Sequence, residues 1–232
     1  MLVRYPLGEQ RSGRLGATIA SHNRYGAYYR AGTIPVNPNT ARQIEMRAAV
    51  GQLSIAWANT LTPAQRAGWD LYGSNVPWYN KLGQVVSLKG LAHYVRSNTA
   101  RVAANLDRID DPPTSFTLEW PEDDLQLSAS EATQQFTFGF YDAAEWANTD
   151  GGAQFIYVGA PQNPSRTFFK GPYRLLAVVE GSLASPPASP IAALDTPDWP
   201  ITEGQRIWCR TRVSSADGRL SQFAETNFLV GA

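Results

Sequence analysis

Four acidic side chains near the middle of the chain form the densest group that could perform acid–base chemistry. Glu119 precedes a Trp-Pro pair, and Glu122, Asp123 and Asp124 follow it. Paired carboxylates can hydrolyse glycosidic bonds, one acting as acid and the other as base or nucleophile. The proline indicates a turn, where charged side chains are ordinarily solvated, so we favour a surface cluster. A weak calcium site is a second interpretation, but the alternating oxygen ligands of a specific calcium loop are missing.

Other residue types that catalyse reactions or bind metals are sparse. His22 and His93 are the two histidines, and Cys209 is the single cysteine. No His-x-x-x-His or Cys-x-x-Cys spacing favours a transition-metal site. Neither a Gly-x-Ser-x-Gly nucleophile elbow nor a Gly-x-x-x-x-Gly-Lys phosphate loop is present. We therefore predict no catalytic residue, no metal site and no cofactor.

Arginine and tyrosine are concentrated at the start of the chain. The candidate partner-binding residues there are Arg4, Arg11, Arg14, Arg24, Tyr25, Tyr28, Tyr29, Arg30, Arg42 and Arg47. Such a set suits either the phosphates and bases of a nucleic acid or an acidic protein surface. The chain as a whole is neutral and has only three lysines. We therefore expect a protein partner rather than nucleic acid.

A second set of candidate contact residues lies on one predicted strand near the C-terminus. Trp208, Arg210 and Arg212 alternate there with smaller or apolar residues, so the two sets face opposite ways. Cys209 belongs to the inward set and is predicted to be a small core residue. The outward row has two interpretations. Its arginine stems could cover the sheet and pair with acids on a neighbouring strand, or the row could contact another copy or a sugar stacked on Trp208.

Length and charge together indicate a globular protein in two parts. The chain has 232 residues, 43% of them hydrophobic, which is enough to bury a core. Its 20 basic and 20 acidic residues cancel, but residues 1–111 carry 13 basic against 6 acidic and residues 112–232 carry 7 against 14. This split favours two domains. It also suggests that copies could meet basic part to acidic part.

The sequence has no segment that resembles a membrane span or a secretory signal. A span requires about 18 to 20 apolar residues, and no window approaches that length. The first four residues, Met-Leu-Val-Arg, are followed at once by Pro6 and Gly8, which rules out an apolar signal run. We expect synthesis in the cytoplasm and no membrane contact.

The first 39 residues are predicted to form an extended basic arm. Glycine and arginine are frequent in this segment, and residues 15–20 are expected to form one short strand. Thr40 and Gln43 match a capping box, in which each side chain bonds a free backbone N–H at the start of a helix. A helix is therefore predicted over residues 41–59.

Two further helices are predicted before residue 110. Thr62 and Gln65 repeat the capping-box pattern for a short second helix that ends near Gly73. Ser87 is expected to cap the third helix. Its apolar stripe is predicted to contain Leu91, Val95, Val102 and Leu106. Asn98 falls beside this stripe, where a buried asparagine ordinarily makes a helix–helix hydrogen bond.

The charged segment 107–113 ends in two prolines, and after it the periodicity becomes alternating. Strands are predicted over residues 116–120, 136–140, 154–159, 166–169, 173–180, 205–213 and 223–230. Seven short strands are typical of a β-sandwich. The predicted fold class is α+β in two parts, with an extended arm over 1–39, a small helical domain over 40–110 and an antiparallel β-sandwich over 111–232.

The run from Ile207 to Ser221, Ile-Trp-Cys-Arg-Thr-Arg-Val-Ser-Ser-Ala-Asp-Gly-Arg-Leu-Ser, resembles the last two strands of a fibronectin type III-like domain. Asp217-Gly218 is a strong turn dipeptide between them. The resemblance covers this hairpin well and the rest of the C-terminal half loosely. It implies an immunoglobulin-like sandwich but no particular function, because such sandwiches serve many roles.

Three motifs in the N-terminal half resemble a group of uncharacterised proteins from tailed phages and prophages. They are Gly-Arg-Leu-Gly at residues 13–16, Asn-Pro-x-Thr-x-x-Gln-x-x-x-Arg at residues 37–47 and Leu-Thr-x-x-Gln-Arg-x-x-Trp at residues 61–69. The resemblance covers residues 10–105. It implies a virion component rather than an enzyme, and carries no residue-level activity with it.

Together, these patterns predict a non-enzymatic structural protein of a tailed-phage virion. The expected task is capsid decoration or cementing, with the basic arm docked on the major capsid protein and the chain forming a closed homo-oligomer. A position in the neck, tail or fibre is the alternative within this class. A carbohydrate- or surface-binding module is the alternative from another class, with Trp78, Trp146 and Trp199 as its exposed platform.

Overall fold

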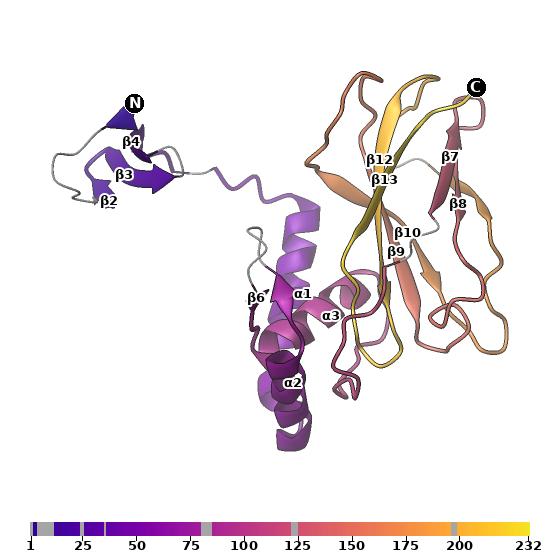
Figure 1. Cartoon of the computed structure of the whole chain (residues 1–232), viewed down its shortest axis with the longest axis horizontal. Coiled ribbons are helices and arrows are strands. Elements are labelled where there is room, and N and C mark those ends of the chain that lie inside the picture. The colour runs from indigo at the N-terminus through magenta and orange to yellow at the C-terminus, as the bar shows by residue number, and fades with distance from the viewer. Residues whose placement is uncertain are drawn as a thin grey trace. The chain divides into compact units, whose positions relative to one another are not determined.

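The computed structural model describes residues 2–3, 12–23, 26–34, 36–79, 85–121, 125–195 and 199–232. Within these ranges the chain combines three α-helices with several antiparallel sheets, so the predicted α+β class is confirmed. Contacts divide the chain into two compact units, residues 1–43 and residues 44–232 (Figure 1).

The first unit contains a small antiparallel sheet, where an extended arm was predicted. Its strands are β1 (Leu2–Val3), β2 (Gly13–Leu15), β3 (Thr18–Asn23) and β4 (Gly26–Ala31), in the order β1-β4-β3-β2. Gly16 lies in the turn between β2 and β3, and its φ of 59° is one that glycine adopts without strain. The prediction of a single strand over residues 15–20 is therefore wrong, because the chain reverses direction within that segment.

The first two helices have the predicted positions. They are α1 (Ala41–Asn59) and α2 (Pro63–Asn75). At the start of α1, the N–H of Gln43 donates to the Thr40 hydroxyl at 3.4 Å. At the start of α2, the N–H of Gln65 donates to the Thr62 hydroxyl and the Gln65 side chain accepts from the N–H of Thr62. The second capping box is therefore confirmed in full, and it fixes where α2 begins.

The third helix, α3 (Gly90–Ala103), begins later than predicted and turns a different face inward. Ser87 is not its cap, because the Ser87 hydroxyl donates to the carbonyl of Gly73 and the N-cap position is Lys89. The buried residues of α3 are Gly90, His93, Tyr94, Ser97, Asn98, Ala100 and Arg101. Of the predicted stripe, Val95, Val102 and Leu106 do pack against the hydrophobic clusters, whereas Leu91 is exposed. Polar side chains occupy much of the inner face, so apolar periodicity could not locate it.

The second unit also contains two larger sheets and a two-stranded ribbon. The four-stranded sheet has the order β10-β9-β12-β13, and the three-stranded sheet has the order β11-β8-β7. The strands are β5 (Trp78–Tyr79), β6 (Val85–Val86), β7 (Gln126–Ser130), β8 (Gln135–Gly139), β9 (Ala153–Gly159), β10 (Tyr173–Glu180), β11 (Ile191–Asp195), β12 (Arg206–Ser214) and β13 (Ala224–Leu229).

Five of the seven predicted strands are confirmed, namely β8, β9, β10, β12 and β13. Residues 116–120 and 166–169 instead form loops, although their aromatic residues alternate as in a strand. The sequence patterns missed β7 and β11, the two edges of the three-stranded sheet. Both are five-residue strands, Gln-Leu-Ser-Ala-Ser and Ile-Ala-Ala-Leu-Asp, without the aromatic residues that marked the predicted strand β8.

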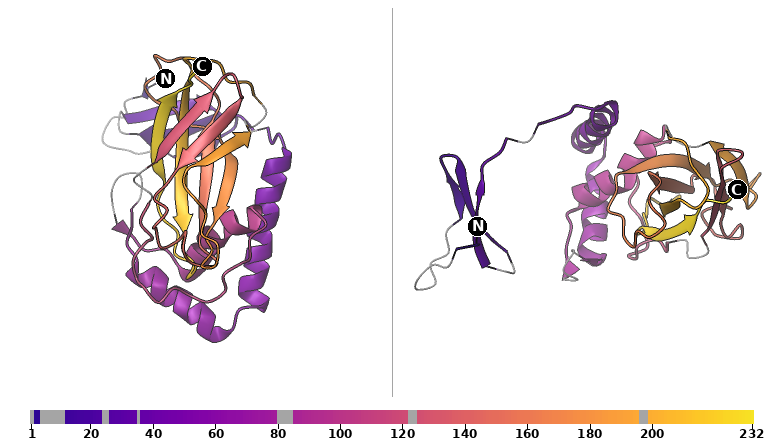
Figure 2. Two further views of the ribbon diagram at one scale, coloured as in Figure 1. Left: turned by 90° about the vertical axis from the view of Figure 1, so that its right-hand side faces the viewer. Right: turned by 90° about the horizontal axis from the view of Figure 1, so that it is seen from above.

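The two larger sheets face each other across a shared hydrophobic core (Figure 2). Phe136 and Phe138 of β8 meet Ile156 of β9 and Ile207 and Cys209 of β12 in this core. The predicted inward side of the strand at 205–213 is thus confirmed. Burial raises the pKa of the Cys209 thiol to about 12, so this cysteine is a small apolar core residue.

The helices are joined to the four-stranded sheet by buried polar and apolar contacts. Arg101 of α3 is buried and donates to the Gly151 carbonyl at 2.9 Å, and Arg96 donates to the Ser221 carbonyl at 2.8 Å. The glycine of the predicted Asp-Gly turn, Gly218, has a φ of 90°, and a Cβ there would lie 3.3 Å from the ring of Trp69. The helices from Ile44 onward and the two larger sheets therefore belong to one compact unit, residues 44–232.

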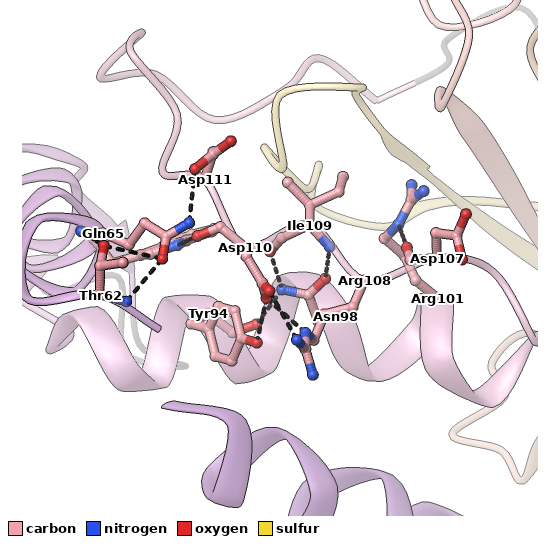
Figure 3. A network of polar contacts seen from close by, with 11 residues as sticks. Thr62, Gln65, Tyr94, Asn98, Arg101, Asp107, Arg108, Ile109, Asp110 and Asp111 are labelled. Atoms are coloured by element: carbon pink, nitrogen blue, oxygen red, sulfur yellow. Dashed lines mark hydrogen bonds and ion pairs between the residues drawn. The ribbon is translucent and has the colours of Figure 1, made fainter. Parts of the chain in front are cut away.

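The segment predicted as a domain boundary is held along α3 by hydrogen bonds (Figure 3). Asn98 is fully buried, and its amide both donates to the carbonyl and accepts from the N–H of Ile109, at 2.9 and 2.8 Å. Tyr94 donates to Asp110 at 2.8 Å, and Arg108 pairs with the same carboxylate. The expected hydrogen bonding of Asn98 is confirmed, but its partner is this segment and not another helix.

Candidate interaction surfaces

The N-terminal sheet aligns several of the predicted contact residues on one face. Directly paired residues of neighbouring strands lie on the same side of a sheet. Arg14 of β2 pairs with Ile19 of β3, which pairs in turn with Arg30 of β4. Tyr28 lies two residues from Arg30 along β4, and therefore on the same face. Tyr29 points to the opposite face.

This small sheet has no buried side chain among those that the structure describes between residues 12 and 40. Residues 1–43 also carry six arginines against one glutamate, a net charge of +5, which residues 44–232 balance with −5. A sheet gains stability by burying one face against another element. The described part of this basic sheet therefore buries no side chain of its own.

The remaining predicted residues of this set are not all brought to that face. Arg4, Arg11, Arg24 and Tyr25 lie outside the described residues. Arg42 and Arg47 are exposed on α1, beyond the sheet. The structure thus groups Arg14, Tyr28 and Arg30 from the predicted set and leaves the two helical arginines on a separate element.

The predicted outward row on β12 lies against aromatic side chains instead of facing solvent freely. Trp208 is only 7% exposed and stacks on Phe169, with ring centroids 5.7 Å apart and planes inclined by 22°. Gly159 follows Val158, the residue of β9 that pairs with Cys209, and a Cβ on Gly159 would come within 2.2 Å of the Phe169 ring. The loop over residues 166–169, which was predicted to be a strand, thus covers Trp208 with Phe169, and the missing side chain of Gly159 leaves space for that ring.

Arg210 and Arg212, the next two residues of this row, contact aromatic rings with their guanidinium groups. The Arg210 guanidinium lies 4.3 Å from the ring centre of Tyr173 and 4.2 Å from that of Phe223. Arg212 lies 4.7 Å from the same ring of Phe223. Burial lowers the pKa of Arg212, and burial together with Arg212 lowers the pKa of Arg96 to about 10. The row therefore has the arrangement of a structural stack in which aromatic faces stabilise the cations.

These contacts bear on both interpretations of the row. The arginine stems do cover the sheet, and Glu225 lies directly across from Arg210 on β13. Trp208 is covered by Phe169, so its face is not open to a sugar ring. Whether the exposed parts of Arg210 and Arg212 also touch a partner stays a prediction.

The tryptophans predicted as a binding platform are mostly enclosed. Trp146 is buried and lies against Phe140, with centroids 5.1 Å apart. Trp199 is half-buried beneath the guanidinium of Arg174, 4.7 Å from its ring centre. The side chain of Trp78 lies outside the described residues.

Trp120 is instead 80% exposed, because the segment predicted as a strand over 116–120 is a loop. In the sequence, the proline and acidic residues beside Trp120 indicated that this side chain would be exposed.

The acidic group around residue 119 contributes an ion pair. Glu119 accepts a hydrogen bond from the Ser215 hydroxyl and pairs with Arg219 at 3.2 Å, and Arg219 also pairs with Asp217 at 2.7 Å. Glu119 thus ties its loop to the β12–β13 hairpin. Glu122, Asp123 and Asp124 lie outside the described residues, so the rest of the predicted cluster has no structural description.

The described ranges also lack the groupings that metal binding or a membrane crossing would use. No three His, Cys, Asp or Glu side chains within them could hold a metal ion. None of the described helices is long and apolar enough to cross a bilayer. An open pocket of about 410 Å³ is lined by residues 125–128, Thr137, Gly139, Pro190 and residues 226–228, and none of these side chains is titratable. This pocket offers no acid or base for catalysis.

Comparisons with known proteins assign no family to the chain. No family model matches it, and a search of curated proteins found no match either. Any functional conclusion therefore depends on the surfaces described above and on the resemblance carried by the motifs in residues 10–105.

Proposed function

We propose that this protein is a non-enzymatic structural component of a tailed-phage virion, and that it decorates or cements the capsid. In this proposal, residues 1–43 dock on an acidic surface of the major capsid protein, and residues 44–232 face neighbouring copies or solvent. The motifs in residues 10–105 supply the link to phage proteins. The protein would be made in the host cytoplasm and become part of the virion on assembly.

The observation that carries this proposal is the N-terminal sheet without buried side chains in its described part. Its net charge of +5 and the alignment of Arg14, Tyr28 and Arg30 on one face supply charge and anchors for a contact. Arginine and tyrosine are enriched among the residues that dominate protein interfaces. A protein surface of opposite charge could cover one face of this sheet.

For the second unit, we propose the immunoglobulin-like sandwich that its last hairpin suggests. Support comes from the antiparallel order β10-β9-β12-β13 facing β11-β8-β7 across one core, and from the Asp-Gly turn between β12 and β13. Such a unit would act as a rigid outward body, with its surface free for contacts between copies. A position in the neck, tail or fibre would use the same two units and stays an alternative.

A carbohydrate- or surface-binding module is the second candidate, favoured by one observation. Trp120 is 80% exposed, and its neighbour Glu119 is fixed by Ser215 and Arg219. An exposed indole on an anchored loop could stack against a sugar ring. A glycan-binding screen of the full chain and of Trp120→Ala would decide. Saturable binding lost in Trp120→Ala supports this module, and the absence of binding removes it.

The docking role is tested by reversing charge on the basic face. Full-length Arg14→Glu/Arg30→Glu should lose at least tenfold in affinity for purified phage particles that lack this chain, because two cations would face an acidic surface as anions. Exposed Lys170 provides the control: its change to Glu also reverses a positive charge, leaves residues 1–43 intact and should keep wild-type affinity. Equal binding by all three proteins would show that the N-terminal sheet is not the docking element.

A further inference from the structure

Helix α1 has two apolar faces, and only one of them is buried against the described part of residues 44–232. Ala49, Leu53 and Ala56 are buried, and Leu53 and Ala56 pack in a cluster with Trp69 and Tyr94 of the other helices. A helix with apolar residues on all sides is ordinarily buried on all sides. The outer face of α1, which the described part of residues 44–232 leaves exposed, is therefore a candidate contact surface.

The outer face forms a regular stripe. Its residues are Ile44, Ala48, Gly51, Ile55 and Ala58, and every one of them is exposed. Ile44 is 50% exposed and Ile55 is 63% exposed. Successive members are separated by four, three, four and three residues, which is the heptad spacing of a coiled-coil seam. This spacing favours another α-helix as the partner of the stripe, because two helices whose apolar residues repeat every 3.5 residues stay in contact along their length.

Gly51 supplies an independent sign of a close neighbour. Glycine in the middle of a helix destabilises it by about 1 kcal/mol relative to alanine. A Cβ built at Gly51 would meet no described atom within 4 Å, so packing within the chain does not require a glycine there. Small residues on a helix face allow the backbone of a second helix to approach closely. The stripe has such residues at three of its five positions.

We infer that the outer face of α1 pairs with the α1 of a second copy of this chain, with the two helices antiparallel. In this register, Ile44 of each copy meets Ile55 of the other, and Ala48 meets Gly51 between them. Large side chains would fill the two outer layers, and small ones would form a close central contact. The arrangement is two-fold symmetric and closes on itself, so it yields a dimer.

Charge favours the antiparallel direction. Residues 1–43, with a net charge of +5, immediately precede most of α1, and residues 44–232 carry −5. Parallel helices would bring two basic segments to the same end of the pair. In this register the antiparallel helices place the two copies of Ala41 about 25 Å apart along the helix axis, so the two basic segments begin at opposite ends of the pair. This inference does not depend on the proposed place in a virion.

The oligomeric state of the full chain tests the pairing. Sedimentation equilibrium at micromolar concentrations should give a dimer for the wild type. Ile44→Glu/Ile55→Glu should weaken dimerisation at least tenfold, while circular dichroism shows an unchanged fold. Leu71→Glu, which makes the same kind of change at an exposed apolar residue of α2, should remain dimeric. A monomeric wild type, a dimeric double variant or a dissociated Leu71→Glu would each overturn the inference.

Disulfide trapping tests the direction of the helices. The only native cysteine, Cys209, is buried and will not interfere. A mixture of Ile44→Cys and Ile55→Cys chains should form mixed disulfide dimers under mild oxidation, and neither variant should do so alone. In the antiparallel register two copies of residue 44 are about 16 Å apart, beyond the reach of a disulfide. Crosslinking of Ile44→Cys with itself would contradict the antiparallel arrangement.

Discussion

His93 is a fully buried ionisable side chain at the contact between α2 and α3. Its ring lies edge-on to that of Tyr72, with centroids 5.1 Å apart. Neither ring nitrogen is hydrogen-bonded in the described structure, and Arg96 lies one turn along the helix on the same side. Burial, together with the positive charge of Arg96, lowers the pKa of His93 to about 4. His93 is therefore neutral in the folded protein at pH 7 and resists protonation.

This burial predicts acid sensitivity. The unfolded chain takes up a proton on His93 near pH 6.5, whereas the folded chain does so near pH 4, so the free energy of unfolding should fall as pH drops through this window. The full loss is on the order of 3 kcal/mol. His93→Phe keeps an aromatic ring against Tyr72 and should remove this contribution to the pH dependence of the free energy of unfolding. Urea unfolding between pH 4 and pH 7 measures it. The same pH dependence of the unfolding free energy in the wild type and in His93→Phe would contradict the lowered pKa of His93.

Arg210 makes the most extensive cation–aromatic contact of the outward row. Arg210→Lys retains the charge but loses the planar group that lies 4.3 Å from Tyr173 and 4.2 Å from Phe223. We expect the free energy of unfolding to fall by about 1 kcal/mol. Arg166 is the comparison, because it is exposed and its guanidinium lies farther from its rings, at 5.5 Å from Phe168 and 5.6 Å from Phe169; Arg166→Lys should therefore lower stability less. If Arg210→Lys left stability intact but weakened binding to the particle, Arg210 would be a partner contact instead.

Residue types alone correctly predicted the direction of these side chains but not their surroundings. Alternation on the strand over 205–213 separated Cys209 from Trp208, Arg210 and Arg212, since successive side chains point to opposite faces. It could not show that Phe169 covers Trp208, because that contact joins a distant loop to the strand. The exposure of Trp120 was missed for a related reason. Alternating aromatic residues occur both in strands and in loops that pack against a sheet, so the pattern alone does not distinguish the two.

At the scale of elements, residues 107–113, which follow α3, form the connection between the helices and the sheets. Asn98, Tyr94 and Arg101 bind it at Ile109, Asp110 and Asp107, respectively, so it follows the helix closely. Burial opposes the charge on Asp110, but hydrogen bonds from Arg108 and Tyr94 outweigh it and hold the pKa of this carboxyl below its usual value. A segment rich in charge and proline therefore acts as a fixed part of the fold.

Removing the Asn98 amide should destabilise the second unit strongly. Asn98→Ala leaves both the N–H and the carbonyl of Ile109 without their partner, at a cost of about 3 kcal/mol. Ser54→Ala is a matched control, because this exposed side chain bonds only its own helix at Val50. Its effect should stay within about 0.5 kcal/mol. Chemical unfolding measures both, and a similar small effect for the two variants would contradict the structural role of the network.

The elements predicted best were those specified by local hydrogen bonding. The capping residues Thr40 and Thr62 located α1 and α2, because each side chain satisfies a backbone group within its own turn. The Asp217-Gly218 turn located the β12–β13 hairpin in the same way. By contrast, β7, β11 and the N-terminal sheet depend on pairing with other strands. Their arginine-, alanine- and serine-rich sequences carry little pattern of their own.

At the scale of the whole molecule, charge is divided between the two compact units. Residues 1–43 carry +5 and residues 44–232 carry −5, and the division falls at the start of α1. In our proposal the basic unit binds the particle through its sheet, and α1 joins two copies. The two contacts use different residues, Arg14 and Arg30 for one and Ile44 and Ile55 for the other, so each can be removed separately.

The central claim is that this chain is a structural part of a phage particle, and a count of its copies in purified particles tests it most directly. Quantitative mass spectrometry against the major capsid protein would give the ratio of the two chains. A capsid decoration protein should be present at a ratio close to a small whole-number fraction of the capsid protein, as closed symmetry requires. A few copies per particle would indicate the neck or tail. Complete absence of the chain from intact particles would contradict the account.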